Sequence, residues 1–209
     1  LQTLNAERPD HPATPEALRA GLADVDPRVR LAAASLMGVV KGGRETLLAL
    51  AADEAVADDV SARAVSELRS HLPLDAARIT LADALVARRL RTAAACVDRL
   101  GRGLEDAPLV ARVLERERGE LATAAARALG RCGSADDVPL LREVESRHPR
   151  ADPLAVACRG AVASIQTRQP GASHGRLSLA EDRSGQLSVP SASGGEVSLA
   201  RRGRGRADA

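Results

Sequence analysis

The feature that most constrains the fold is a helical pattern that recurs about every 31 residues. Five segments align when their first residues are placed at positions 29, 60, 92, 121 and 154. Each has a small residue at its fifth position and a larger residue four places before it and four places after it. Because positions i, i+4 and i+8 lie on one face of an α-helix, the pattern predicts five helices that bury this face.

The small positions define the packing that we expect. They are Ala33, Ala64, Cys96, Ala125 and Cys158. The larger residues around them are Val29, Val60, Thr92, Leu121 and Leu154 on one side, and Met37, Leu68, Leu100, Leu129 and Val162 on the other. The chain has no Phe, Tyr or Trp, so the usual large anchors of a core are missing. Small central side chains let helices approach closely, and we therefore expect an all-α core of Ala, Leu and Val.

A second set of helices is expected between these segments. More Leu-rich stretches lie at 16–22, 45–52, 76–88, 109–116 and 138–144. Each pair predicts a helix–turn–helix unit, with five units and about ten helices in all. Acidic residues near helix starts are interpreted as N-terminal caps; they are Asp26, Asp58, Asp59, Asp106, Asp136 and Asp137. Glycines after the segments predict left-handed C-terminal caps; they are Gly42, Gly43, Gly101, Gly103, Gly130 and Gly133.

Two segments carry the pattern most clearly, VRLAAASLMG from Val29 to Gly38 and AAARALGRCG from Ala124 to Gly133. They resemble the short bacterial HEAT-like repeats, which also occur in phycobilisome lyases. The resemblance covers residues 14–169 and implies a right-handed α-α superhelix, an armadillo-like solenoid of about five helix pairs. Arg99 and Arg159 depart from it, since they stand at sites that are usually small. Repeat arrays serve many partners, so the resemblance specifies the fold better than the function.

The ends of the chain are expected to differ from this domain. Residues 1–13 are interpreted as a linker or the remnant of an upstream segment, because the first residue is Leu and not Met. Residues 170–209 are rich in Gly and Ser, and we expect a disordered tail. A ten-residue repeat runs through it, which is interpreted as local duplication or as three copies of a docking motif that adds a strand to a partner. Its key residues are Leu177, Ser178, Leu179, Leu187, Ser188, Val189, Val197, Ser198 and Leu199.

No motif indicates catalysis, a cofactor or a metal site. Two of the three cysteines, Cys96 and Cys158, occupy small positions and are interpreted as packing residues, as is Cys132. No two cysteines have the spacing of a zinc pair. His71 and His148 precede or nearly precede Pro at helix ends, where a His favours the helix dipole. A Gly-x-Ser-x-Gly match at 171–175 lacks the strand and helix that a nucleophile elbow needs, so it is interpreted as chance.

The sequence therefore predicts a non-catalytic, protein-binding scaffold of bacterial type. Function is expected on the long face of the second helices, where arginines could bind acidic or phosphorylated partners. The candidates are Arg28, Arg30, Arg63, Arg91 and Arg127, although solvated or paired arginines are the simpler alternative. The tail would be a tether or docking motif.

Two alternatives remain open at the level of sequence. One is an Arg-driven binder of nucleic acid or anionic surfaces, which would use the four arginines of residues 201–206. The other is a lyase-like enzyme related to bilin lyases. Such enzymes commonly surround a flat ligand with aromatic side chains, as do HEAT-like folds that act on DNA bases. This chain has no aromatic side chain, which counts against this alternative. We expect a cytoplasmic protein without a membrane span, monomeric or part of a larger chain.

Overall fold

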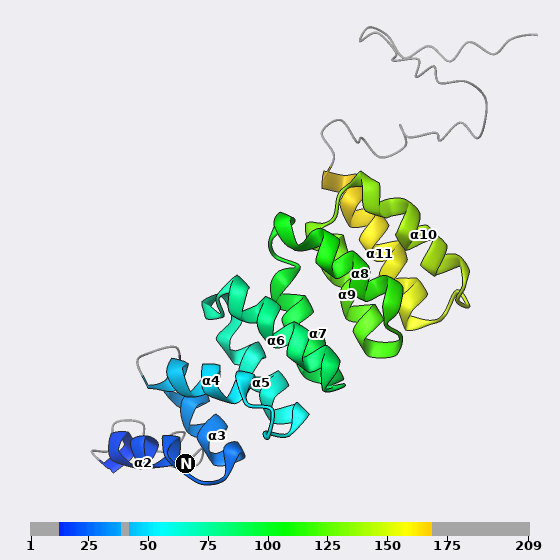
Figure 1. The fold of residues 1–209 in the computed structure, drawn as a ribbon. Coiled ribbons are helices and arrows are strands. Elements are labelled where there is room, and N and C mark those ends of the chain that lie inside the picture. The colour runs from blue at the N-terminus through cyan, green and yellow to red at the C-terminus, as the bar shows by residue number, and fades with distance from the viewer. Residues whose placement is uncertain (1–12, 39–41, 169–209) are drawn as a thin grey trace, which may run out of the picture. The chain divides into compact units, whose positions relative to one another are not determined.

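The computed structural model describes residues 13–38 and 42–168. All of them belong to the first of two compact units, Leu1–Ser173 and His174–Ala209. Within these residues the chain forms helices and no strand (Figure 1). The α-helices are α2 (Ala13–Leu22), α3 (Pro27–Met37), α4 (Gly43–Ala52), α5 (Asp58–Leu68), α6 (Leu74–Val86), α7 (Leu90–Leu100), α8 (Ala107–Arg116), α9 (Gly119–Cys132), α10 (Val138–Ser146) and α11 (Pro153–Arg168). Three 3-10 segments are η1 (Arg69–His71), η2 (Leu104–Asp106) and η3 (Ala135–Asp137).

The aligned segments of the sequence coincide with alternate helices. They correspond to α3, α5, α7, α9 and α11, which we call the second helices. Each packs against the helix that precedes it in the chain, and successive second helices pack against each other. The second helices therefore lie side by side in chain order (Figure 1). The prediction of an all-helical fold is confirmed for the described residues.

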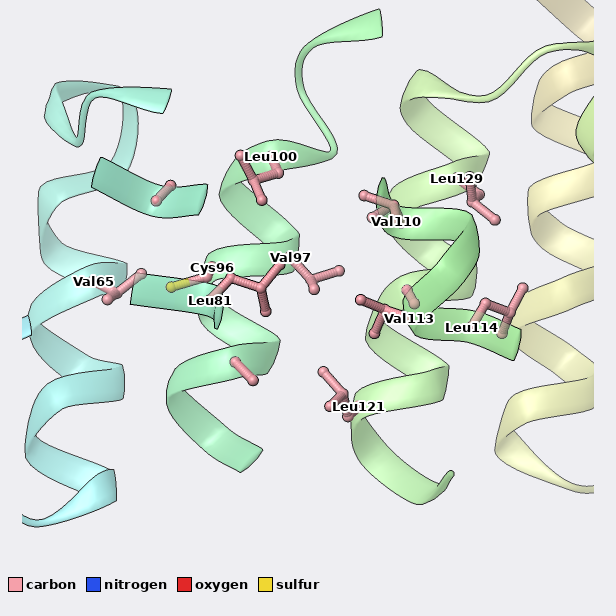
Figure 2. Packing of buried hydrophobic residues seen from close by; sticks show 14 of the residues in the cluster. Val65, Leu81, Cys96, Val97, Leu100, Val110, Val113, Leu114, Leu121 and Leu129 are labelled. Atoms are coloured by element: carbon pink, nitrogen blue, oxygen red, sulfur yellow. The ribbon is translucent and has the colours of Figure 1, made fainter. Parts of the chain in front are cut away.

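The small column lies at the centre of these helix contacts. Its five residues, Ala33, Ala64, Cys96, Ala125 and Cys158, each expose 0% of their surface. Figure 2 shows Cys96 of α7 directed toward α5, the helix that carries Val65. The larger flanking residues are buried in α5, α7, α9 and α11, whereas Val29 and Met37 of α3 are half-buried. The contact between α3 and α5 is smaller than the contacts between the other successive second helices, which leaves these two residues partly exposed.

Two glycines allow neighbouring second helices to approach closely. A Cβ at Gly130 of α9 would lie 2.9 Å from the Cα of Ala161 in α11. A Cβ at Gly101, which follows α7, would lie 2.5 Å from the Cβ of Ala128 in α9. The prediction of left-handed caps is wrong at Gly43, Gly101, Gly103, Gly130 and Gly133; of the predicted set only Gly42 has a positive φ, at 96°. At Gly101 and Gly130 the neighbouring helix leaves no room for a side chain, whereas the backbone conformation would allow one.

The predicted aspartate caps are confirmed at α3 and wrong at α5, α8 and α10. Asp26 caps α3, since its carboxylate accepts a hydrogen bond from the backbone N–H of Arg28 at 2.8 Å. Asp106 and Asp137 stand directly before α8 and α10, but each ends a 3-10 turn in a helical conformation and does not cap the following helix. The Asp137 carboxylate instead accepts from the backbone N–H of Ser134 at 2.7 Å, within its own turn.

Asp106 is turned into the protein and joins α6 to the turn before α8. Its side chain exposes 2% of its surface and accepts a hydrogen bond from Nε of Arg78 at 2.7 Å. Nη1 of Arg78 also lies 2.7 Å from the carboxylate of Asp75, one turn away in α6. The hydrogen bond to Asp106 is the main cause that raises the pKa of Arg78. The cap predicted from sequence is therefore replaced by an ion pair between repeats.

Asp58 caps a helix of the next repeat. It is the first residue of α5, and the α5 N-cap position, Ala57, makes no side-chain cap. The Asp58 carboxylate accepts from the backbone N–H groups of Arg91 at 3.0 Å and Thr92 at 2.9 Å, and from the Thr92 hydroxyl at 2.7 Å. Burial acts to raise the pKa of Asp58, but these hydrogen bonds hold it below its ordinary value. The start of α7 is thus capped by a residue 33 positions earlier.

Candidate functional site

One face of the second helices remains open to solvent. We call it the second-helix face and define it by six exposed residues, Arg63, Ser66, Asp98, Arg127, Arg131 and Gly160. In the repeat alignment these residues fall within a narrow arc of the helix, because they follow the segment start by three, six or ten residues. Two hollows open along this face, one between α5 and α7 and one bounded by α7, α9 and α11.

Three of the five predicted arginines are held by contacts within the chain. Nη2 of Arg28 lies 3.6 Å from the carboxylate of Asp59, across the boundary between the first two repeats. The Arg63 guanidinium pairs with Glu67 at 2.6 Å along α5. Arg30 donates to the backbone carbonyls at 24 and 25, at 2.9 and 3.0 Å, in the turn before α3.

The remaining predicted arginines differ in their surroundings. Arg91 and Arg127 are exposed and make no ion pair with any other residue that the structure describes. Arg127 lines the larger hollow, whereas Arg91 lies at the start of α7 and lines neither of the two. The five predicted arginines therefore do not gather into one site.

The smaller hollow, between α5 and α7, contains three other arginines. We call it the arginine groove; it has a volume of about 160 Å³ and is lined by Val65, Ser66, Arg69, Ala95, Asp98, Arg99 and Arg102. Nε of Arg99 donates to the carbonyl of Leu72 at 2.9 Å, which positions its guanidinium beside η1. Arg69 and Arg102 make no ion pair within residues 13–38 and 42–168. The groove therefore offers cationic donors that no described carboxylate neutralises.

The larger hollow combines a polar pair with small apolar residues. It has a volume of about 640 Å³ and is lined by Ala94, Gly119, Glu120, Thr123, Ala124, Arg127, His148, Asp152, Pro153 and Leu154. Nδ1 of His148 lies 3.4 Å from the carboxylate of Asp152. The backbone N–H of Leu154 also donates to this carboxylate, at 2.8 Å, and is the main cause that lowers the pKa of Asp152. Asp152 thus caps α11 and contacts His148, which follows the end of α10.

The thiols of the described chain are unsuited to nucleophilic chemistry. All three cysteines are free and buried. Burial raises the pKa of Cys96 to about 12 and that of Cys158 to about 11, and it also raises the pKa of Cys132. Since the thiolate is the reactive form of Cys, these side chains are inert in the folded protein. Nor do the described residues bring together three His, Cys, Asp or Glu side chains that could hold a metal ion.

Sequence reasoning missed two residues of the arginine groove, Arg69 and Arg102. A signal for Arg69 was present in the repeat alignment, because it occupies the column that holds Gly38, Gly101 and Gly130. The predicted tail residues, Leu177, Ser178, Leu179, Leu187, Ser188, Val189, Val197, Ser198 and Leu199, lie outside the described residues, as do residues 201–206.

No family model, curated protein or solved structure matches this chain. None of the helices between residues 13 and 168 combines the length and the apolar character that crossing a bilayer requires.

Proposed function

We propose that residues 14–169 form a HEAT-like solenoid that binds a protein partner through its second-helix face and carries no catalytic site. The contacts of each second helix with its own first helix and with the next second helix are those expected of stacked repeats. Such arrays bind partners along an extended surface built from equivalent positions of successive repeats.

The observation that carries this proposal is that both hollows open between second helices. Their walls combine small residues, such as Ala94, Ala95 and Ala124, with arginine at the rim. Arg is enriched at protein interfaces, where its stem covers apolar surface and its guanidinium forms several hydrogen bonds. No residue that lines either hollow belongs to α2, α4, α6, α8 or α10.

The chemistry of the larger hollow favours binding over catalysis. His148 and Asp152 resemble the base and orienting group of a hydrolase, but a nucleophile would also be needed within hydrogen-bond reach. The one hydroxyl among the lining residues belongs to Thr123, and it donates to the carbonyl of Gly119 at 2.9 Å.

The tail is proposed to act as a tether, or as a docking motif in which residues 177–199 contact the partner.

Site-specific photocrosslinking tests this proposal in the full 209-residue chain. Benzoylphenylalanine replaces Arg63 or Arg127 on the second-helix face, and Arg112 or Arg116 on α8 as matched controls that lose the same charge. We expect partner crosslinks from positions 63 and 127 and none from 112 and 116, with and without residues 170–209. Equal crosslinking from both sets, or crosslinking from α8 alone, would contradict the proposed face.

A further inference from the structure

The arginine groove lies at a position where the next two pairs of second helices, α7 with α9 and α9 with α11, make a tight contact. Gly101 lies against Ala128, and Gly130 against Ala161. In the repeat alignment the residue equivalent to these glycines in α5 is Arg69, and the residue equivalent to these alanines in α7 is Arg99. Two long cationic side chains therefore stand where a glycine meets an alanine in the other two contacts. The hollow between α5 and α7 opens at that point.

Arg69 is also held in a backbone conformation that suits Gly. Its φ is 47° and its ψ is −123°, while Gly38, at the equivalent position of the first repeat, has a φ of 67°. A non-glycine residue in such a region is strained, and residues of this kind are concentrated at ligand sites. Gly at position 69 would remove the strain but also the guanidinium.

The charge of the groove is unbalanced. Three guanidinium groups line it, and the single lining carboxylate, Asp98, already pairs with Arg131 at 2.6 Å. Arg99 is further fixed by its hydrogen bonds to the carbonyls of Leu72 and Ser70. Arg99 is thus positioned before any ligand arrives, which lowers the entropy cost of binding an anion.

We infer that the arginine groove binds the phosphate group of a phosphorylated Ser or Thr side chain on the partner, an inference that rests on the proposed function. A phosphate monoester carries a charge close to −2 and three free oxygens, which suit several guanidinium groups better than one carboxylate does. The groove volume of about 160 Å³ leaves room for a phosphate group, which has five heavy atoms.

A phosphopeptide fits the described surface better than a nucleic acid does. Of the other arginines on the second-helix face, Arg63 pairs with Glu67 and Arg131 with Asp98, and only Arg127 has no ion pair among the described residues. A nucleic acid backbone needs a continuous cationic track, and single strands also stack their bases on aromatic side chains. The chain has no aromatic residue. One isolated cationic groove is suited to one phosphate.

The test is a titration of the full chain, followed by NMR of the arginine Nε–H signals. The probe is N-acetyl-O-phosphoserine amide, with N-acetylserine amide, N-acetylglutamate amide and a twelve-nucleotide dT strand as comparisons. We expect saturable shifts at Arg69 and Arg102 with the phosphoserine probe, binding about tenfold weaker in Arg69→Gly and Arg102→Gln, and unchanged binding in Arg112→Gln. Arg69→Gly should also unfold at a higher temperature, because it removes the strained conformation, so its loss of binding does not reflect unfolding.

Several outcomes would overturn the inference. They are equal binding of serine and phosphoserine probes, unchanged phosphoserine binding in Arg69→Gly and Arg102→Gln, and salt-sensitive binding of the dT strand without phosphoserine binding. Crosslinks from positions 63 and 127 without phosphoserine binding would overturn this inference and leave the proposed function standing. Phosphoserine binding without those crosslinks would support the groove and contradict the protein-binding face.

Discussion

Two helical glycines should respond to alanine in opposite directions. Gly130 lies inside α9, where an added Cβ would be 2.9 Å from the Cα and 3.2 Å from the Cβ of Ala161. Gly160 lies inside α11, is exposed, and would place its Cβ in open space. The two sites therefore differ in packing while sharing a helical backbone.

The difference between the two variants isolates the cost of the close contact. Ala is favoured over Gly in a helix interior by about 1 kcal/mol, and this gain applies to both sites. Gly160→Ala should therefore raise the free energy of unfolding by about 0.5–1 kcal/mol. At Gly130 the new methyl group meets backbone, which cannot rotate away, and overpacking of this kind costs about 1–3 kcal/mol. We expect Gly130→Ala to be less stable than Gly160→Ala by that amount.

Urea and thermal unfolding followed by circular dichroism at 222 nm measure this difference. Intrinsic Trp or Tyr fluorescence cannot serve because the chain has neither residue. A change of 1 kcal/mol should shift the melting temperature by about 2–4 °C in a chain of this size. The midpoints of unfolding are compared only between variants whose unfolding transitions have the same slope, since stacked repeats can lose two-state behaviour. Equal stability of the two variants would refute the close packing of α9 against α11.

The remaining predictions concern contacts between repeats and the buried thiols. Asp58→Ala removes the cap of α7, so the free energy of unfolding at pH 7 should fall by about 1–2 kcal/mol in urea titrations. Because the folded pKa of Asp58 lies below its ordinary value of 3.8, its contribution is present above that value and is lost as the pH falls through the folded pKa. Parent and variant should therefore converge as the pH falls below the folded pKa, and a constant difference would contradict this linkage. Arg78→Met leaves the Asp106 carboxylate buried without its cation and should lower the urea midpoint, while adding Asp106→Leu should recover part of the loss; an unchanged midpoint would show that the pair is not stabilising. Burial raises the pKa of Cys96 to about 12 and of Cys158 to about 11, so both should resist iodoacetamide at pH 8, as measured by mass spectrometry. Stability should fall as the pH rises above the unfolded value of 9.0 toward the folded values, because the unfolded thiols ionise first; rapid labelling of the folded chain would contradict the burial.

The helix pairing could be predicted because it depends on local periodicity. A residue that recurs at i, i+4 and i+8 lies on one helix face whatever the helix packs against. That is why Ala64, Cys96 and Ala125 could be assigned to helix contacts without knowledge of the neighbours, and why all three are fully buried. Proline residues also indicated where helices begin, since Pro27 and Pro108 fall in the first turns of α3 and α8.

Hydrogen-bond partners could not be predicted in the same way, because they depend on contacts across repeats. Asp58 was expected to cap its own helix, yet the free N–H groups nearest to its carboxylate belong to Arg91 and Thr92. The same limit applies to the candidate arginines. Whether Arg28 is free depends on Asp59 in the next repeat, 3.6 Å away in space and 31 positions away in sequence.

The glycine column shows how one aligned position can serve packing in one repeat and binding in another. At Gly130 the absent side chain lets α11 approach, so adding a methyl group should lower stability. At Arg69 a long side chain occupies the equivalent position with a φ of 47°, so removing it should raise stability while weakening anion binding. The sequence alone shows the exception at position 69, but not that Arg99 lies opposite it, 30 positions later. A lower melting temperature for Arg69→Gly would mean that the side chain stabilises the helix contact itself, and the groove would then be a packing feature without need of a ligand.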